Sequence, residues 1–196
     1  TETAPTVFQV QGCTGAWSVF FLMNTLPSFD FVFSLCSLAS VTLSHSSGWG
    51  TTFAPVFKYC TIGTVSVDCS GDGLLRLEHC IVDQNFNLFG SLVVLRHCTL
   101  NGPVDIHDDT SGSIRAEMHA YNTVFAVNTG STITITTSLG YQTDPGFTFD
   151  QCDFTNADVS ITNNRVYPVF TSCHFGGYAS FATTYGVYSN CTFDNG

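Results

Sequence analysis

The amino-acid sequence predicts an all-β protein folded as a right-handed parallel β-helix, a solenoid of about eight coils with 18–30 residues in each. Three observations lead to this prediction. The composition favours strands, a cysteine-centred motif recurs along most of the chain, and polar turn sequences separate copies of the motif.

The composition combines a large apolar fraction with few charges. Of the 196 residues, 44% are hydrophobic and 10% are charged, against about 25% charged in an average soluble domain. Phenylalanine occurs 18 times, and glutamate occurs only at Glu2, Glu78 and Glu117. Val, Thr, Phe and Tyr favour pleated sheets. The chain therefore has enough apolar surface for a core, and we expect strands to build it.

The recurring motif reads apolar-x-x-Cys-x-apolar and surrounds seven of the nine cysteines. The seven copies are Phe33-Cys36-Leu38, Phe57-Cys60-Ile62, Leu77-Cys80-Val82, Leu95-Cys98-Leu100, Phe149-Cys152-Phe154, Phe170-Cys173-Phe175 and Tyr188-Cys191-Phe193. Val10-Cys13 matches on one side only, and Cys69 lies outside the series. At this hydrophobic content, chance would give about two matches. The motif is therefore a real repeat.

The spacing of the motif indicates a solenoid. From Cys13 onward the intervals are 23, 24, 20, 18, 54, 21 and 18 residues, and the long interval divides if Asn122, followed by Val124, replaces a cysteine. A period near 20 residues fits coils of short strands joined by turns. We expect these positions to form a vertical structural ladder at the bends: Cys36, Cys60, Cys80, Cys98, Asn122, Cys152, Cys173 and Cys191.

Neighbouring positions support the same register. The residues three before and two after each cysteine are expected to point inward, and the positions between them are polar. Two outward columns follow from this alignment: Lys58, Glu78 and Arg96 in one, with opposite charges adjacent, and the rings of Tyr59, His79, His97 and Tyr121 in the other. Polar turn sequences such as 70–73, 101–103 and 128–130 lie between the motifs.

Residues 1–30 are less regular and are predicted to form an N-terminal cap or an atypical first coil, with the solenoid over 31–196. The last motif ends at Phe193, and the chain begins with Thr. We therefore expect a processed piece of a larger assembly, in which other chains cover the terminal strands.

On these repeats, the chain resembles the pectin-lyase-like right-handed β-helix of polysaccharide lyases, phage tailspikes and viral surface proteins. The resemblance is one of architecture over roughly residues 31–193 and identifies no particular family. It implies either a structural or attachment role, or activity on carbohydrates.

The densest group of titratable residues is Asp105, His107, Asp108 and Asp109. Glycoside hydrolases use paired carboxylates, so this group is the candidate catalytic site. However, the Asn-Thr-Asp, Gly-His-Gly and Arg-Ile-Lys motifs that polygalacturonases of this fold would require are absent from the sequence. One lysine and four scattered arginines also provide little for lyase chemistry on uronates. An acidic surface turn is the favoured interpretation.

The cysteines are interpreted as free, buried thiols, folded in a reducing compartment. Nine is an odd number, and a ladder in register serves as packing without any covalent bond. The sequence contains no Cys-x-x-Cys or Cys/His pair at zinc spacing, so we predict no metal and no cofactor.

The net charge and the hydropathy of the chain limit the classes of partner that it can bind. A net charge of −10 with five Lys and Arg residues argues against nucleic-acid binding. The apolar stretch 17–43 is interrupted by Asn24, Pro27 and Asp30, so buried strands are favoured over a membrane span. We expect a non-enzymatic structural or attachment protein, a capsid-associated or surface spike component of a virion that forms homo- or hetero-oligomers through protein or glycan contacts. The alternative is a polysaccharide lyase or glycoside hydrolase of this fold, or its inactive sugar-binding relative.

Overall fold

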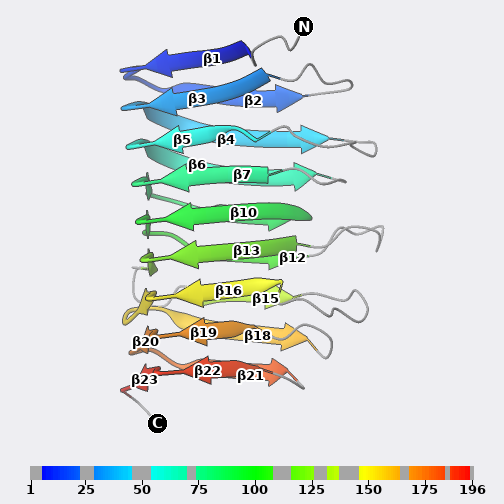
Figure 1. Cartoon of the computed structure of the whole chain (residues 1–196), viewed down its shortest axis with the longest axis vertical. Coiled ribbons are helices and arrows are strands. Elements are labelled where there is room, and N and C mark those ends of the chain that lie inside the picture. The colour runs from blue at the N-terminus through cyan, green and yellow to red at the C-terminus, as the bar shows by residue number, and fades with distance from the viewer. Residues whose placement is uncertain are drawn as a thin grey trace, which may run out of the picture.

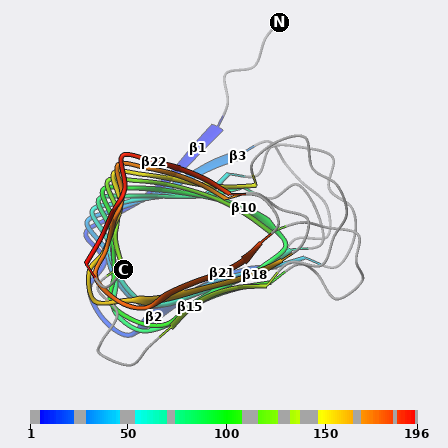
Figure 2. The ribbon, with the colours of Figure 1, turned by 90° about the horizontal axis from the view of Figure 1, so that it is seen from below.

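The computed structural model describes residues 6–22, 29–45, 54–69, 74–107, 116–125, 132–136, 146–163, 168–183 and 186–194. These residues form parallel strands stacked in successive coils, which confirms the predicted all-β solenoid (Figure 1). Viewed along its axis, the solenoid shows the coils superimposed around a common interior (Figure 2). In the described part of the chain, no helix has the length and hydropathy needed to cross a lipid bilayer.

One wall of the solenoid is a nine-stranded parallel sheet, called sheet A here. Its strands follow one another in chain order along the solenoid axis. They are β1 (Thr6–Gln11), β3 (Phe29–Ser34), β5 (Val56–Lys58), β7 (Leu74–Glu78), β10 (Ser91–Arg96), β13 (Ala116–Tyr121), β16 (Phe147–Asp150), β19 (Val169–Thr171) and β22 (Val187–Ser189).

The remaining strands form a 14-stranded parallel sheet, called sheet B. It begins with three long strands, β2 (Trp17–Leu22), β4 (Ser37–His45) and β6 (Thr61–Cys69). In later coils this path divides, because β6 pairs with both β8 and β9. The short branch is β8 (Ile81–Val82), β11 (Thr99–Leu100), β14 (Val124–Phe125), β17 (Asp153–Phe154), β20 (His174–Phe175) and β23 (Thr192–Phe193). The other branch is β9 (Phe86–Phe89), β12 (Val104–His107), β15 (Thr132–Thr136), β18 (Asp158–Asn163) and β21 (Ala179–Thr183).

Side chains alternate in direction along each strand, so that every second side chain points into the interior of the solenoid. Strands such as β10 and β13 alternate buried residues with half-buried or exposed ones over their whole length. Because the coils are in register, inward side chains stack on their equivalents: Phe33 on Phe57 and Phe149 on Phe170, each with ring centroids 4.8 Å apart. The core is therefore a set of apolar columns that run along the axis.

A sharp bend follows each strand of sheet A. The bend residue has a left-handed backbone, with φ between 47° and 69° in every coil. At Tyr59, the N–H donates to the carbonyl of Glu78 in the next coil at 2.9 Å. The bend residues are Gly12, Leu35, Tyr59, His79, His97, Asn122, Gln151, Ser172 and Asn190. We call the residue after each of them the ladder position.

The first coil belongs to the same sheets as the others. β1 pairs in parallel with β3, and β2 pairs in parallel with β4. The strands at 6–22 are thus paired in parallel as those of later coils are, and the division of the chain into 1–30 and 31–196 stays a prediction. Residues 1–5 and 23–28 lie outside the described residues.

Candidate functional site

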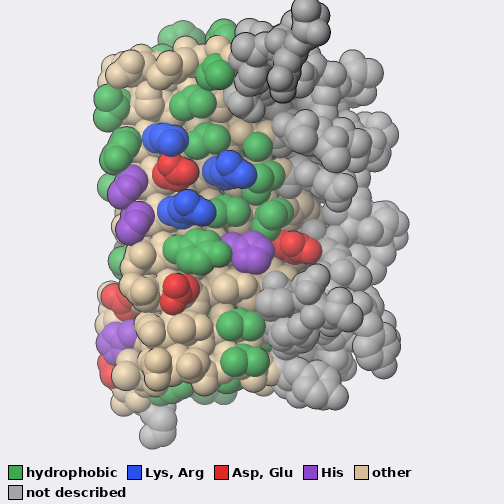
Figure 3. All heavy atoms as spheres, viewed as in Figure 1, with side chains coloured by type: hydrophobic (Ala, Val, Ile, Leu, Met, Phe, Trp, Pro, Cys, Tyr) green, Lys and Arg blue, Asp and Glu red, His purple; other side chains and the backbone are tan. Residues whose placement is uncertain are grey.

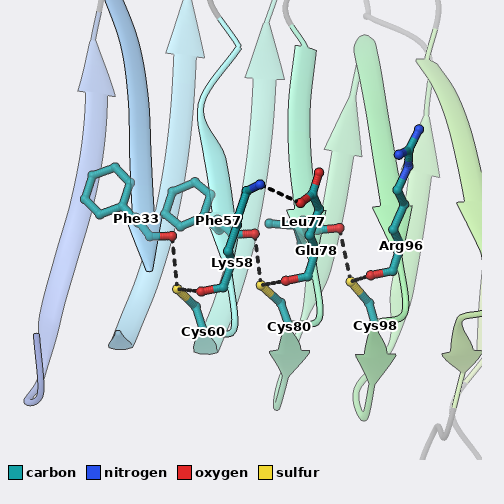
Figure 4. Close-up of polar contacts among 9 residues, drawn as sticks. All are labelled: Phe33, Phe57, Lys58, Cys60, Leu77, Glu78, Cys80, Arg96 and Cys98. Carbon is teal, nitrogen blue, oxygen red and sulfur yellow. Dashed lines mark hydrogen bonds and ion pairs between the residues drawn. The ribbon is translucent and has the colours of Figure 1, made fainter. Parts of the chain in front are cut away.

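The predicted structural ladder lies at the bends, where each thiol meets two carbonyls. Cys80 Sγ lies 3.3 Å from the carbonyl oxygen of Phe57 in the preceding coil and 3.4 Å from that of Glu78 in its own coil (Figure 4). The single S–H proton has two acceptors within reach, so either can be satisfied. The same pair of contacts recurs at Cys36, Cys60, Cys98, Cys152, Cys173 and Cys191.

The assignment of Asn122 to the ladder is wrong by one residue. Asn122 is the left-handed bend residue, with φ 47°, and Thr123 occupies the ladder position with 0% exposure. The Thr123 hydroxyl donates to the carbonyl of Tyr121 at 3.1 Å, as the thiols do in other coils. Phe125, and not Val124, is the inward residue that follows, since it pairs with Leu100. In this coil a buried hydroxyl with a carbonyl acceptor replaces the thiol, so the cysteine motif does not identify the ladder residue.

Hydrogen bonds between neighbouring ladder thiols move their pKa values in opposite directions: Cys80 lowers the pKa of Cys60 to about 7, and Cys152 lowers that of Cys173. Burial raises the pKa of Cys98, and it is also the main cause of the raised pKa of Cys36. A hydrogen bond to Cys60, followed by burial, raises the pKa of Cys80. The eight cysteines with described side chains are all free; Cys69 is outside this set. The ladder thiols whose pKa is raised stay protonated, and a protonated, buried thiol is a poor nucleophile and a poor metal ligand.

The predicted catalytic group is only partly within the described residues, because Asp108 and Asp109 lie outside them. Asp105 and His107 point outward from β12, with Asp105 Oδ1 2.6 Å from His107 Nε2. The His107 ring stacks on Phe89 with centroids 5.6 Å apart. Across the strands, Asp105 neighbours Asn87 and Thr134. Within the described residues, Asp105 therefore has an imidazole partner and no second carboxylate on the adjacent strands.

A second polar network, around His174, was not found from the sequence. His174 Nε2 lies 3.0 Å from Asp194 Oδ2, and its Nδ1 lies 3.0 Å from the Thr155 hydroxyl. That hydroxyl in turn donates to the carboxylate of Asp153. Since the hydroxyl proton points to Asp153, the Thr155 oxygen accepts from Nδ1 while Asp194 accepts from Nε2. Both ring nitrogens then donate, which describes an imidazolium and not a general base.

The pKa of His174 agrees with this arrangement. The hydrogen bond to Asp194 is the main cause that raises this pKa above its ordinary value. The sequence contains one indication of this network. The position immediately after the ladder residue is polar in the last three coils, where it is Asp153, His174 and Thr192. No group of three His, Cys, Asp or Glu side chains is placed to hold a metal ion in the part of the chain that the structure describes.

The outer face of sheet A carries the charged column predicted from the sequence. Lys58 and Glu78 form an ion pair at 2.9 Å. Arg96 is in register with Glu78, but its guanidinium lies over the ring of Tyr121, 5.7 Å from the centroid. Tyr121 therefore belongs to this column and not to the ring column in which the sequence analysis placed it. Arg76 is exposed on the same face, two residues before Glu78.

The ring column follows the edge of this face at the bends. Tyr59 stacks on His79 with centroids 4.8 Å apart, and His79 stacks on His97 at 4.7 Å. All three rings are exposed. We call Lys58, Arg76 and Arg96 the cationic patch, and His79 and His97 lie beside it. Figure 3 shows Lys and Arg side chains gathered on this face, with His beside them.

Comparisons with known proteins give no family. The chain matches no protein-family model, no curated protein and no solved structure. The functional argument therefore depends on the surfaces of this chain.

Proposed function

We propose that the chain is a non-enzymatic structural or attachment module that acts through the outer faces of its sheets, by contacts with proteins or glycans. The arrangement of the polar side chains supports this proposal. In the described residues, the charged and imidazole side chains face outward, and the imidazole–carboxylate contacts are closed pairs or networks. A contact surface needs such outward side chains, whereas acid–base catalysis needs free groups that converge on one substrate atom.

The core supports the same proposal. Each coil is held to the next by parallel pairing on both walls, by ladder contacts and by stacked rings. Neighbouring coils therefore hold outward side chains at a fixed spacing, and this suits a ligand or partner that spans several coils. The placement of this module on a virion or other particle remains a prediction from the sequence.

The alternative, a carbohydrate-active enzyme, is favoured by one observation, the Asp105–His107 pair beside Phe89. A carboxylate with an imidazole and an adjacent ring is a plausible fragment of a sugar site. The described residues do not complete it with a second carboxylate on the neighbouring strands.

The test is a turnover assay on neutral and acidic polysaccharides that measures new reducing ends and unsaturated uronate products. We expect no product above background from the chain. Product that disappears in Asp105→Asn but persists in Glu117→Gln, a carboxylate on β13 of the other sheet, would overturn the proposal. Both variants remove one negative charge, so a difference between them reports on the site.

A further inference from the structure

The charge distribution of the solenoid is uneven. Three of the five Lys and Arg residues of a chain with net charge −10 lie on the adjacent strands β5, β7 and β10. These three strands carry one acidic residue, Glu78, which pairs with Lys58, and sheet A next carries Glu117 on β13 and Asp150 on β16. With that pair neutral, Arg76 and Arg96 leave this part of the face positive.

Both arginines are available to a ligand. They are exposed, and no carboxylate of the described residues pairs with either of them. Arg96 is opposite Glu78 on the next strand, and Arg76 is two residues before Glu78. A strand spacing of about 4.8 Å and a rise of about 6.6 Å over two residues put their Cα atoms roughly 8 Å apart. Two guanidinium groups at this separation can each bind one anionic group of the same ligand.

We propose that the cationic patch binds an anionic polysaccharide, with Arg76 and Arg96 each taking a carboxylate or sulfate group. This inference rests on the proposed attachment function and names the ligand class. The polymer lies across β5, β7 and β10, so that successive sugars meet successive coils. The edges of the Tyr59, His79 and His97 rings are exposed beside the arginines and present hydroxyl and imidazole groups to the sugar hydroxyls.

Two other polyanions fit less well. Nucleic acid requires many cations to displace its counterions, and two unpaired arginines on a strongly acidic chain provide few. An acidic protein needs a largely apolar contact centre to bind well. At the centre of this face are instead the Lys58–Glu78 ion pair and Arg96. A hydroxyl-rich anionic polymer matches the polar groups that are present.

The test is binding of the intact chain to immobilised heparin, polygalacturonate, dextran, poly-L-glutamate and single-stranded DNA, at low and physiological salt. We expect binding to heparin or polygalacturonate that weakens as salt rises, and none to dextran. The two anionic sugars distinguish a sulfated from a carboxylated ligand. The double substitution Arg76→Gln, Arg96→Gln should weaken binding about tenfold.

A matched control separates the patch from net charge. Ser66→Glu with Thr162→Glu places two negative charges on the outer side of sheet B and gives the same net charge, −12, as the arginine variant. This control should bind within about twofold of the unmodified chain. Equal losses in the two variants would overturn the inference. So would a lack of binding to both anionic sugars, or equal binding to poly-L-glutamate or DNA.

The failure of this inference differs from failure of the proposed function. Absence of sugar binding together with absence of turnover would remove the polysaccharide ligand and leave a module that acts through protein contacts. Turnover that depends on Asp105 would remove the non-enzymatic proposal, whatever the binding at the patch.

Discussion

Among the described glycines, Gly102 has the shortest distance from a built Cβ to a neighbouring coil, so its replacement by alanine provides a sharp test of the coil stacking. A Cβ on Gly102 would lie 1.2 Å from the carbonyl oxygen of Gln84 and 2.2 Å from its carbonyl carbon. Ordinary contact begins near 3.4 Å, so one backbone must move by about 2 Å. The obstacle is main chain in both coils, and a side-chain rotation cannot relieve it.

The cost follows from the hydrogen bonds that hold these coils. Asn101 N–H donates to the carbonyl of Val82 at 2.8 Å, and Gln84 N–H donates to that of Gly63 at 2.8 Å. Loss of both costs about 2 kcal/mol, and forced overpacking adds about 1–3 kcal/mol. The lower entropy of the unfolded alanine variant returns about 0.4–1 kcal/mol. We therefore expect Gly102→Ala to reduce the free energy of unfolding by about 3 kcal/mol.

Two other glycines give a graded control. At Gly63, a Cβ would lie 2.4 Å from the carbonyl oxygen of Ala39, so Gly63→Ala should cost less than Gly102→Ala. At Gly12, nothing lies within 4 Å, and only the left-handed φ of +69° opposes alanine, which costs about 1 kcal/mol. Urea unfolding followed by circular dichroism ranks the three variants by their loss of stability. Hydrogen exchange at the amides of Gln84 and Asn101 shows whether the destabilisation is local to these coils. A Gly102→Ala variant as stable as Gly12→Ala would refute the stacking described here.

Three further predictions concern the bends. Leu35→Asn should raise the free energy of unfolding by about 0.5 kcal/mol, because Leu35 is 56% exposed with φ 54° and asparagine tolerates this backbone better; a lower urea midpoint would contradict this. A cysteine in place of Thr123 should be protected from thiol reagents in the folded chain, whereas one in place of Asn122 should react, and the opposite labelling pattern would restore the original ladder assignment. The raised pKa of His174 means that its contribution to stability is complete below the ordinary value of 6.5 and is lost as pH rises through the folded-state pKa. Thermal melts across this range should show a loss that His174→Gln abolishes, and an NMR titration midpoint of His174 at or below 6.5 would contradict the network.

The interior could be predicted because every coil needs apolar side chains at the same inward positions. Positions three before and two after the ladder residue are inward in the structure, as Phe57 and Ile62 illustrate. The spacing of Lys58 and Glu78 from their cysteines also gave the correct cross-strand pair. Because every coil needs apolar side chains at equivalent positions, the spacing of these residues in the sequence predicts the register of the coils.

The error at Asn122 has a physical origin. Asn122 was assigned to the ladder because it divides the long interval between Cys98 and Cys152, and this assignment placed Val124 in the core. The structure shows that the bend residue needs a left-handed backbone, which asparagine tolerates, while the ladder position needs a small buried donor. Asn122 meets the first requirement and Thr123 meets the second. The pair therefore fits the bend only with Asn122 as the bend residue and Thr123 at the ladder position.

The site residues could be predicted less well, because outward positions have no common requirement. Asp153 and His174 occupy the same outward column as Ile81 and Val124 in earlier coils. Thr155 and Asp194 lie beyond the short strands, where the motif no longer fixes the geometry. Their contact with His174 depends on side-chain orientation that spacing alone does not specify.

The cationic patch has a feature that coil stacking does not require. Coils about 4.8 Å apart bring like charges together, so stability favours opposite charges on adjacent strands. Lys58 and Glu78 follow this rule. Arg96 is also opposite Glu78, but its guanidinium lies over the ring of Tyr121 and no described carboxylate pairs with it; Arg76 has no carboxylate opposite it on either adjacent strand. Mutual repulsion between these two arginines is a cost that an anion bound between them would remove, and for this reason we centre the ligand, which lies across β5, β7 and β10, on the two arginines.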